Sequence, residues 1–222
     1  LISAITILGK QKSVIRPAIA SVLPTVDKSV VLLDSGASLD VKPKVLFQFA
    51  VMGSKLAEAL FDIESPKIGL LNNGEEESKG RELEKSAFKL LNSSSLNFIG
   101  NVEGRDFATS KVDVFVTDGF TGNVVLKTLE GTAKLQQNLI SDSLKQNLFK
   151  PFIPSVKKAL KPVKDQLNPD KTNASYLLGV NGLVTIGHGS SKQEAIMNGI
   201  NYTNESINKD FIGKFSDAIR EL

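Results

Sequence analysis

The sequence predicts an α/β protein in three layers, with a mainly parallel sheet between two layers of helices. Short apolar runs rich in β-branched residues alternate with helical patterns along the chain. These runs are apolar throughout rather than at every second residue, which is typical of parallel strands buried on both faces. The chain has 222 residues, 41% of them hydrophobic, which is enough to bury a substantial core. We therefore expect a single α/β domain over residues 1–222.

Five segments have the composition of buried strands and are bounded by turn residues. They are "VVLLD" at 30–34, "KIGLL" at 67–71, "LNFIG" at 96–100, "VDVFVTD" at 112–118 and "GLVTIG" at 182–187.

Helical periodicity lies between and after these runs. Segments 44–61, 80–91 and 208–222 repeat apolar residues at spacings of three and four. Residues 2–8 also read as an amphipathic helix, and the chain begins without Met. We therefore expect an N-terminally truncated start.

Residues 141–170 differ in composition from the rest. Six lysines and no acid lie between Lys145 and Lys164, and three prolines interrupt an apolar series. Because interior prolines break a straight helix, we expect a projecting arm of kinked amphipathic helices. Its simplest role is a dimerisation element with a solvated lysine face. Alternatively it docks on anionic lipid, with Phe149, Phe152 and Ile153 facing the membrane.

Composition excludes several classes of protein. The net charge is only +3, so a nucleic-acid partner is not expected. Without cysteine there is no disulfide, thiolate metal site or cysteine nucleophile, and with a single histidine we expect no metal site. No apolar run is long enough to cross a membrane. We expect no cofactor, and a reducing cytoplasm is compatible with this composition.

Glycine-containing polar segments follow every predicted strand. They read "DSGASLDVKP", "NNGEEESKG", "NVEGRD", "DGFTGN" and "HGSS". Ligands of open parallel sheets bind beyond the carboxyl ends of the strands, and glycine with a helix start favours bound anions. Lys42, Lys79 and Arg105 would add full charges at the rim. The pattern predicts an anion pocket.

Each of these residues also has a purely structural interpretation. Asp118 and Asp34 can cap helices or hold turns, and Ser190 fits a capping box. His188, as a lone histidine, can be a hydrogen-bonded packing residue. The acids of "GEEES" suit a solvated first helical turn, and Lys42 beside Pro43 suits a turn.

Several motifs, in order, resemble one family. They are "RPAIASVLPT", "DSGASLDVKP", "GLLNNGEEESKG", "NFIGNVEGRD", "DVFVTDGFTGNVVLKTLEG" and "LLGVNGLVTIGHGSS". With close spacing over residues 1 to about 200, they resemble the PlsX phosphate acyltransferases of bacterial phospholipid synthesis. The resemblance implies a fold similar to isocitrate and isopropylmalate dehydrogenases. It also implies a homodimer in the cytoplasm that associates peripherally with the membrane.

The activity that the resemblance implies is transfer of a fatty acyl group from acyl carrier protein to inorganic phosphate. The acyl phosphate would then supply a membrane-bound glycerol-3-phosphate acyltransferase. In our hypothesis phosphate binds Lys79 and the amides from Gly119 to Asn123. The full set of phosphate-binding candidates is Gly119, Thr121, Gly122, Asn123, Lys42 and Ser190.

Four residues are candidates for the chemistry itself: Lys79, Asn72, His188 and Asp118. Asn72 and His188 would orient the thioester carbonyl or assist departure of the thiol. Asp118 would either touch the substrate or hold its loop.

The chain departs from the family pattern in three places. A glycine-rich loop expected just upstream of Leu1 is absent, Ser38 stands where Asn is usual, and "NAS" at 173–175 replaces a more glycine-rich approach. Two other functions therefore stay open. One is a phosphate acetyl or butyryl transferase that uses acyl-coenzyme A, and the other is an inactive membrane-associated module.

Overall fold

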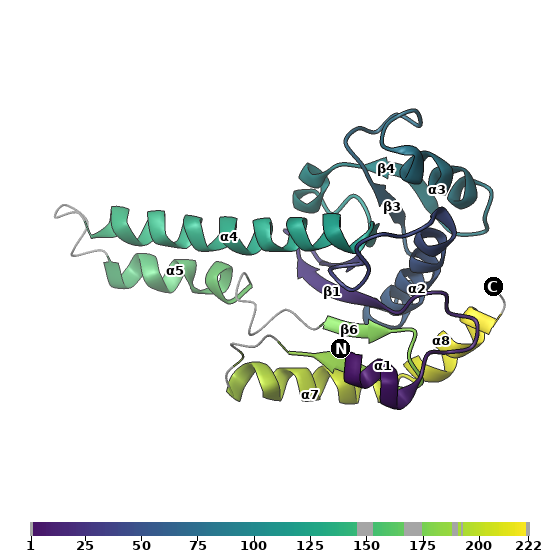
Figure 1. Cartoon of the computed structure of the whole chain (residues 1–222). Coiled ribbons are helices and arrows are strands. Elements are labelled where there is room, and N and C mark those ends of the chain that lie inside the picture. The colour runs from purple at the N-terminus through teal and green to yellow at the C-terminus, as the bar shows by residue number, and fades with distance from the viewer. Residues whose placement is uncertain (1, 146–152, 167–174, 188–190, 192, 221–222) are drawn as a thin grey trace.

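A seven-stranded mixed sheet forms the centre of the molecule. The computed structural model describes residues 2–145, 153–166, 175–187, 191 and 193–220, and orders the strands β4-β3-β5-β2-β1-β6-β7 (Figure 1). The strands are β1 (Ala18–Pro24), β2 (Ser29–Leu33), β3 (Ile68–Leu71), β4 (Phe98–Val102), β5 (Val114–Val116), β6 (Ser175–Leu178) and β7 (Val184–Ile186). The helices are α1 (Ile2–Leu8), α2 (Pro43–Phe61), α3 (Glu82–Asn92), the 3-10 helix η1 (Gly104–Ala108), α4 (Gly119–Leu144), α5 (Ile153–Gln166), α7 (Gln193–Asn208) and α8 (Phe211–Arg220).

The two halves of the sheet pair differently. Strands β4, β3, β5 and β2 are parallel, as the apolar runs predict, whereas β1, β6 and β7 add antiparallel pairings. All five predicted strands form with shifted ends, and β1 and β6 are additional. Strand β1 contains alanine and serine and ends at a proline, and β6 has only four residues, so neither has a strong strand pattern.

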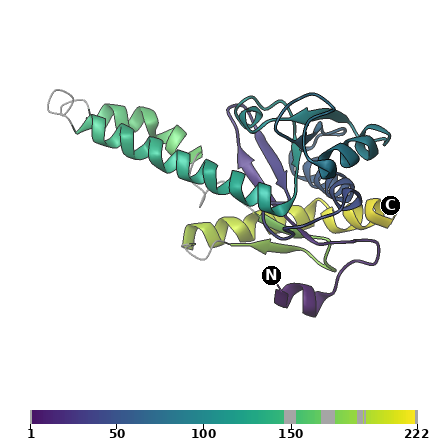
Figure 2. The ribbon, with the colours of Figure 1, turned by 45° about the horizontal axis from the view of Figure 1, so that its top comes forward.

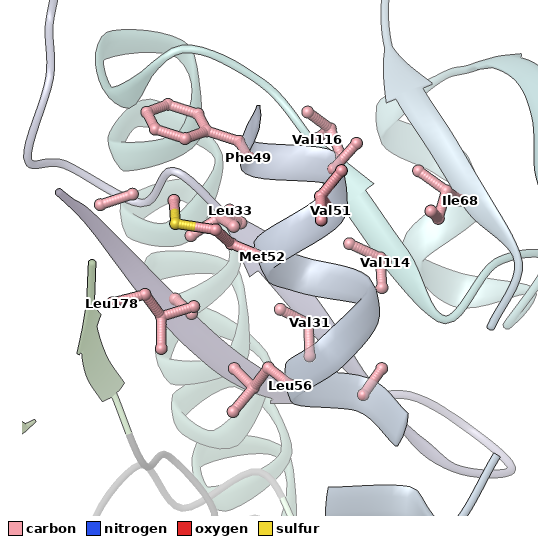
Figure 3. Packing of buried hydrophobic residues seen from close by; sticks show 14 of the residues in the cluster. Val31, Leu33, Phe49, Val51, Met52, Leu56, Ile68, Val114, Val116 and Leu178 are labelled. Atoms are coloured by element: carbon pink, nitrogen blue, oxygen red, sulfur yellow. The ribbon is translucent and has the colours of Figure 1, made fainter. Parts of the chain in front are cut away.

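Helix α2 packs across one face of the sheet and carries most of the core. Phe49, Met52 and Leu56 are fully buried against residues of β2 and β5 (Figure 3). Gly53 permits the close approach of α2 to β5, because a Cβ at this position would lie 2.6 Å from Val114 Cγ1. Helices α3 and α8 pack beside α2 and complete this layer.

The second face has a thinner cover. Phe107 of η1 stacks on Phe115 of β5 with ring centroids 3.8 Å apart, and Val125 and Leu126 of α4 pack nearby. Helix η1 and the first turns of α4 therefore form the helical layer on this second face of the sheet. The rest of α4 leaves the sheet.

Helices α4 and α5 form the projecting arm. Figures 1 and 2 show α4 extending well past the sheet with α5 running beside it. The projection therefore starts earlier than residue 141, because α4 is continuous from Gly119 to Leu144. Pro162 lies inside α5. Phe149 and Phe152 lie outside the described residues, and Ile153 is half-buried at the start of α5.

Large apolar side chains of α4 are exposed along the arm, Leu135 and Leu139 by more than half of their surface. Among the described residues, no helix is both long enough and apolar enough to span a bilayer.

Candidate functional site

Three polar loops meet at one end of the parallel strands. Because β3, β5 and β2 are adjacent and parallel, the loops that follow them, 72–81, 117–118 and 34–42, lie at the same edge of the sheet. This is the edge where open α/β sheets bind ligands.

Asp34 organises the loop after β2. Its Oδ1 accepts hydrogen bonds from the amides of Ile19, Gly36 and Ala37, each at 3.0 Å, and its Oδ2 accepts one from Ser38 at 2.7 Å. Burial raises the pKa of this carboxyl, against the opposing effect of these amides. Asp34 therefore holds the turn, one of the two roles that the sequence left open.

Asp118 is the N-cap residue of helix α4, directly before its first residue, Gly119. Its Oδ1 accepts from the amide of Thr121 at 2.8 Å, and its Oδ2 accepts from the hydroxyl of Thr121 at 3.0 Å. The helix consequently begins at Gly119. This is the capping interpretation of Asp118.

The two glycines of "DGFTGN" allow α4 to start directly against the 34–38 loop. A Cβ on Gly122 would lie 1.9 Å from the carbonyl oxygen of Asp34, and one on Gly119 would lie 2.8 Å from Ser38. The amide of Gly119 also donates to the carbonyl of Ser38 at 2.8 Å. Close packing thus accounts for both glycines.

The amides of this turn differ from the predicted anion nest. Gly119 donates to Ser38, Thr121 donates to Asp118 Oδ1, and Gly122 donates to the carbonyl of Asp118 at 2.9 Å. Because helix α4 already begins at Gly119, these three amides donate to protein oxygens. Any phosphate bound here would depend mainly on side chains and on the positive end of the helix dipole.

Arg81 joins the loop after β3 to the start of α4. Its Nη2 lies 2.5 Å from Asp118 Oδ2, and the guanidinium also binds the buried Glu84. Both partners raise the pKa of Arg81, through hydrogen bonds first and charge second. The sequence did not single out Arg81, since its partner Asp118 lies 37 residues away.

The loop 72–81 is held by two side-chain amides. Asn72 Nδ2 donates to the carbonyl of Lys79 at 3.2 Å, and Asn101 Nδ2 donates to the carbonyl of Glu76 at 2.8 Å. Asn101 is buried, and its Oδ1 has no hydrogen-bond partner among the described residues. Lys79 is exposed, with its side-chain stem lying over Gly74.

The other predicted residues take different positions. Asn123 is exposed on α4 beside Gly36, whose added Cβ would lie 3.6 Å from it. Lys42 is exposed where α2 begins. Arg105 is paired with Glu103 in its own loop. His188 and Ser190 lie outside the described residues.

The described residues contain no group of histidine and acidic side chains arranged to hold a metal ion.

Fold and loops together define an α/β protein with a polar site at the carboxyl edge of a parallel half-sheet. The family model of the fatty acid synthesis proteins matches residues 1–214. The chain belongs to this family, the PlsX phosphate acyltransferases.

Curated relatives agree with this assignment. The chain is 42% identical to the phosphate acyltransferase of Thermosipho melanesiensis and 41% identical to that of Elusimicrobium minutum, and both alignments cover 100% of it. It spans 67% and 65% of those proteins, about two thirds of their length.

Solved structures show a similar fold at low sequence identity. A branched-chain phosphotransacylase from Enterococcus faecalis superposes with a TM-score of 0.55 at 15% identity, over 86% of this chain and 64% of that one. The EutD phosphotransacetylase from Staphylococcus aureus superposes with a TM-score of 0.53 at 15% identity, over 92% of this chain and 58% of that one.

Proposed function

We propose that this chain transfers a fatty acyl group from a carrier thioester to inorganic phosphate. Membership of the phosphate acyltransferase family supports the reaction class. The observation that carries the proposal within the chain is the joining of three loops at one sheet edge. Arg81 links the loop after β3 to Asp118, and Gly119 links α4 to the loop after β2.

The reaction requires two reactants and no covalent enzyme intermediate. An oxygen of hydrogen phosphate attacks the thioester carbonyl carbon and forms the new C–O bond. The C–S bond breaks, and the leaving thiolate takes up the proton that hydrogen phosphate gives up. Phosphate is already a nucleophilic oxyanion at neutral pH, and the chain contains no cysteine to act in its place. The protein must therefore bring two reactants together and stabilise the tetrahedral oxyanion.

Side chains of the three loops, of α4 and of segment 188–190 would share these tasks. Lys79, Lys42 and Asn123 would contact phosphate, with the start of α4 supplying positive potential and Ser190 a further contact. Asn72 and His188 would orient the carbonyl or assist the departing thiol. Asp118 acts by positioning, because both of its oxygens hold Thr121 and Arg81.

The acyl donor separates this function from its nearest alternative. Acyl carrier protein is the proposed donor, whereas a phosphate acetyl or butyryl transferase would use acyl-coenzyme A. Hydroxylamine traps acyl phosphate as a hydroxamate, so the rate can be measured with each donor. A clear preference for the carrier-bound acyl group supports the proposal, and turnover of only acyl-coenzyme A overturns the choice of donor.

The cellular context is part of the same proposal. The enzyme would be a cytoplasmic homodimer that touches the membrane peripherally through α4 and α5 and hands its product to a membrane-bound glycerol-3-phosphate acyltransferase. Exposed Leu135 and Leu139 and the lysines of α5 support a lipid contact. Co-sedimentation with anionic vesicles tests it. Vesicle binding without any turnover would favour the inactive membrane-associated module instead.

A further inference from the structure

A basic surface borders the proposed site, and of its charged members only Lys42 also has a role in the chemistry above. Its charged members are Lys12, Arg16, Lys42 and Lys44, all exposed. None of them has an ion-pair partner in the part of the chain that the structure describes. Asp40 is the only acidic residue in segments 10–17 and 38–48, which carry these cations.

Two segments far apart in the sequence form this surface. Gln48 of α2 accepts a hydrogen bond from the amide of Ile15 at 2.6 Å and donates one to the carbonyl of Ser13 at 2.8 Å. Segment 12–16 therefore lies along the beginning of α2. Lys44 is one helical turn before Gln48, which places it on the same side of that helix.

The surface has an apolar part as well as charge. Ile15 is 49% exposed and Leu39 is 67% exposed, and they belong to the same two segments. Aliphatic side chains with charged groups around them are the usual anatomy of a protein–protein interface. We name this surface, made of Lys12, Ile15, Arg16, Leu39, Lys42 and Lys44, the basic face.

The basic face is continuous with the proposed phosphate site. Pro17 follows Arg16, and its carbonyl accepts from the hydroxyl of Ser38 at 3.5 Å. The carbonyl of Ser38 in turn accepts from the amide of Gly119 at the start of α4. A protein bound on the basic face would therefore lie next to the loops where the acyl group has to arrive.

We propose that the basic face is the docking surface for an acidic carrier protein that delivers the acyl thioester. Carboxylates on the carrier would meet Lys12, Arg16 and Lys44, and Ile15 and Leu39 would pack at the centre. Charge complementarity of this kind acts mainly on the association rate and weakens with salt. The inference rests on the proposed function, because the reaction supplies the reason for a carrier.

The test is a pair of double charge reversals with equal change in net charge. Lys12→Glu with Lys44→Glu alters the basic face, and neither lysine is placed in the phosphate site. Lys67→Glu with Lys89→Glu is the control, since both lysines are exposed, Lys67 precedes β3 and Lys89 lies on α3. Acyl phosphate formation is measured with acyl carrier protein and with acyl-coenzyme A as donors. Binding of unacylated carrier protein is measured separately by titration.

We expect the first variant to raise the KM for acyl carrier protein and the Kd of the carrier by at least about tenfold. The KM for phosphate and the rate with acyl-coenzyme A should stay unchanged, and the control should behave like the original chain. Raised salt should reduce the difference between the two variants.

Three results would overturn the docking surface. They are equal effects of both double variants, an equal loss with acyl-coenzyme A, and loss of anionic-vesicle binding with carrier binding intact. If the original chain forms no acyl phosphate from any donor, the proposed function fails, while the carrier titration still decides the docking surface.

Discussion

Arg81 and Asp118 form an ion pair, 2.5 Å from Nη2 to Oδ2, that joins the loop after β3 to the first turn of α4. Asp118 is almost fully buried, whereas the side chain of Arg81 is 61% exposed. Burial alone would raise the pKa of Asp118, but hydrogen bonds from Thr121 and Arg81 outweigh it and hold that pKa below its usual value. The pair therefore fixes the geometry between two loops of the proposed phosphate site.

Replacing Arg81 should impair both phosphate use and stability. In Arg81→Ala, the loop that carries Lys79 loses its tie to α4, and we expect the KM for phosphate to rise about tenfold. The free energy of unfolding should also fall, by about 1–3 kcal/mol, because Asp118 and Glu84 are left buried without their cation. Kinetics at varied phosphate and urea unfolding measure the two effects. Partial recovery in Arg81→Lys would identify a positioning role, and an unchanged KM in Arg81→Ala would exclude it.

The pH dependence of stability should carry the signature of Asp118. A carboxyl whose pKa is lowered by folding adds stability above its unfolded pKa, near 3.8, and this is lost as pH falls through the lower folded value. Asn also caps helices, so Asp118→Asn keeps the cap and removes the titration. Between pH 5 and pH 2.5, urea unfolding should show a smaller loss of stability in the variant than in the original chain. Equal losses in the two proteins would contradict a lowered pKa for Asp118 in the folded state.

Gly122 should be intolerant of any side chain. In Gly122→Ala, the new methyl group would lie 1.9 Å from the carbonyl oxygen of Asp34, so α4 or the 34–38 loop must move. We expect a loss of about 2–3 kcal/mol in unfolding free energy, the usual cost of overpacking. Gly131→Ala is the matched control in the same helix, with open space around its Cβ. It should gain up to about 1 kcal/mol from helix propensity.

Local sequence patterns predict the parallel half of the sheet and the polar loops after it. Such patterns reflect burial and turn chemistry, which nearby residues determine. The pairing of Arg81 with Asp118 depends on which strands become neighbours, and nothing within a few residues of either encodes it. The glycines of the α4 turn show the same limit, because their sequence suggests an anion nest whereas packing against Asp34 explains them.

Strand β1 lies between β2 and β6, so its first residues reach the carboxyl edge of the parallel strands from the opposite direction. This places Arg16 and Pro17 beside the Asp34 loop. Sequence periodicity does not predict β1, and so it does not predict that a basic segment borders the site.

Lys79 is the residue whose loss should most impair phosphate use. It is exposed in the loop 72–81, which Asn72, Asn101 and Arg81 hold in place. It is the one lysine in the sequence of that loop. Removing its charge with Lys79→Ala should raise the KM for phosphate and lower kcat/KM at least about a hundredfold, equivalent to about 2.7 kcal/mol of transition-state stabilisation. Hydroxamate formation at varied phosphate measures this.

The control for Lys79 is Lys89→Ala, which removes an exposed lysine from α3 outside the site. Its kinetics should match those of the original chain, and both variants should unfold at the same urea concentration, since neither lysine is buried. Lys79→Arg retains the charge, so it should recover part of the lost activity if the charge itself meets phosphate. Equal kinetics for Lys79→Ala and Lys89→Ala would remove Lys79 from the site.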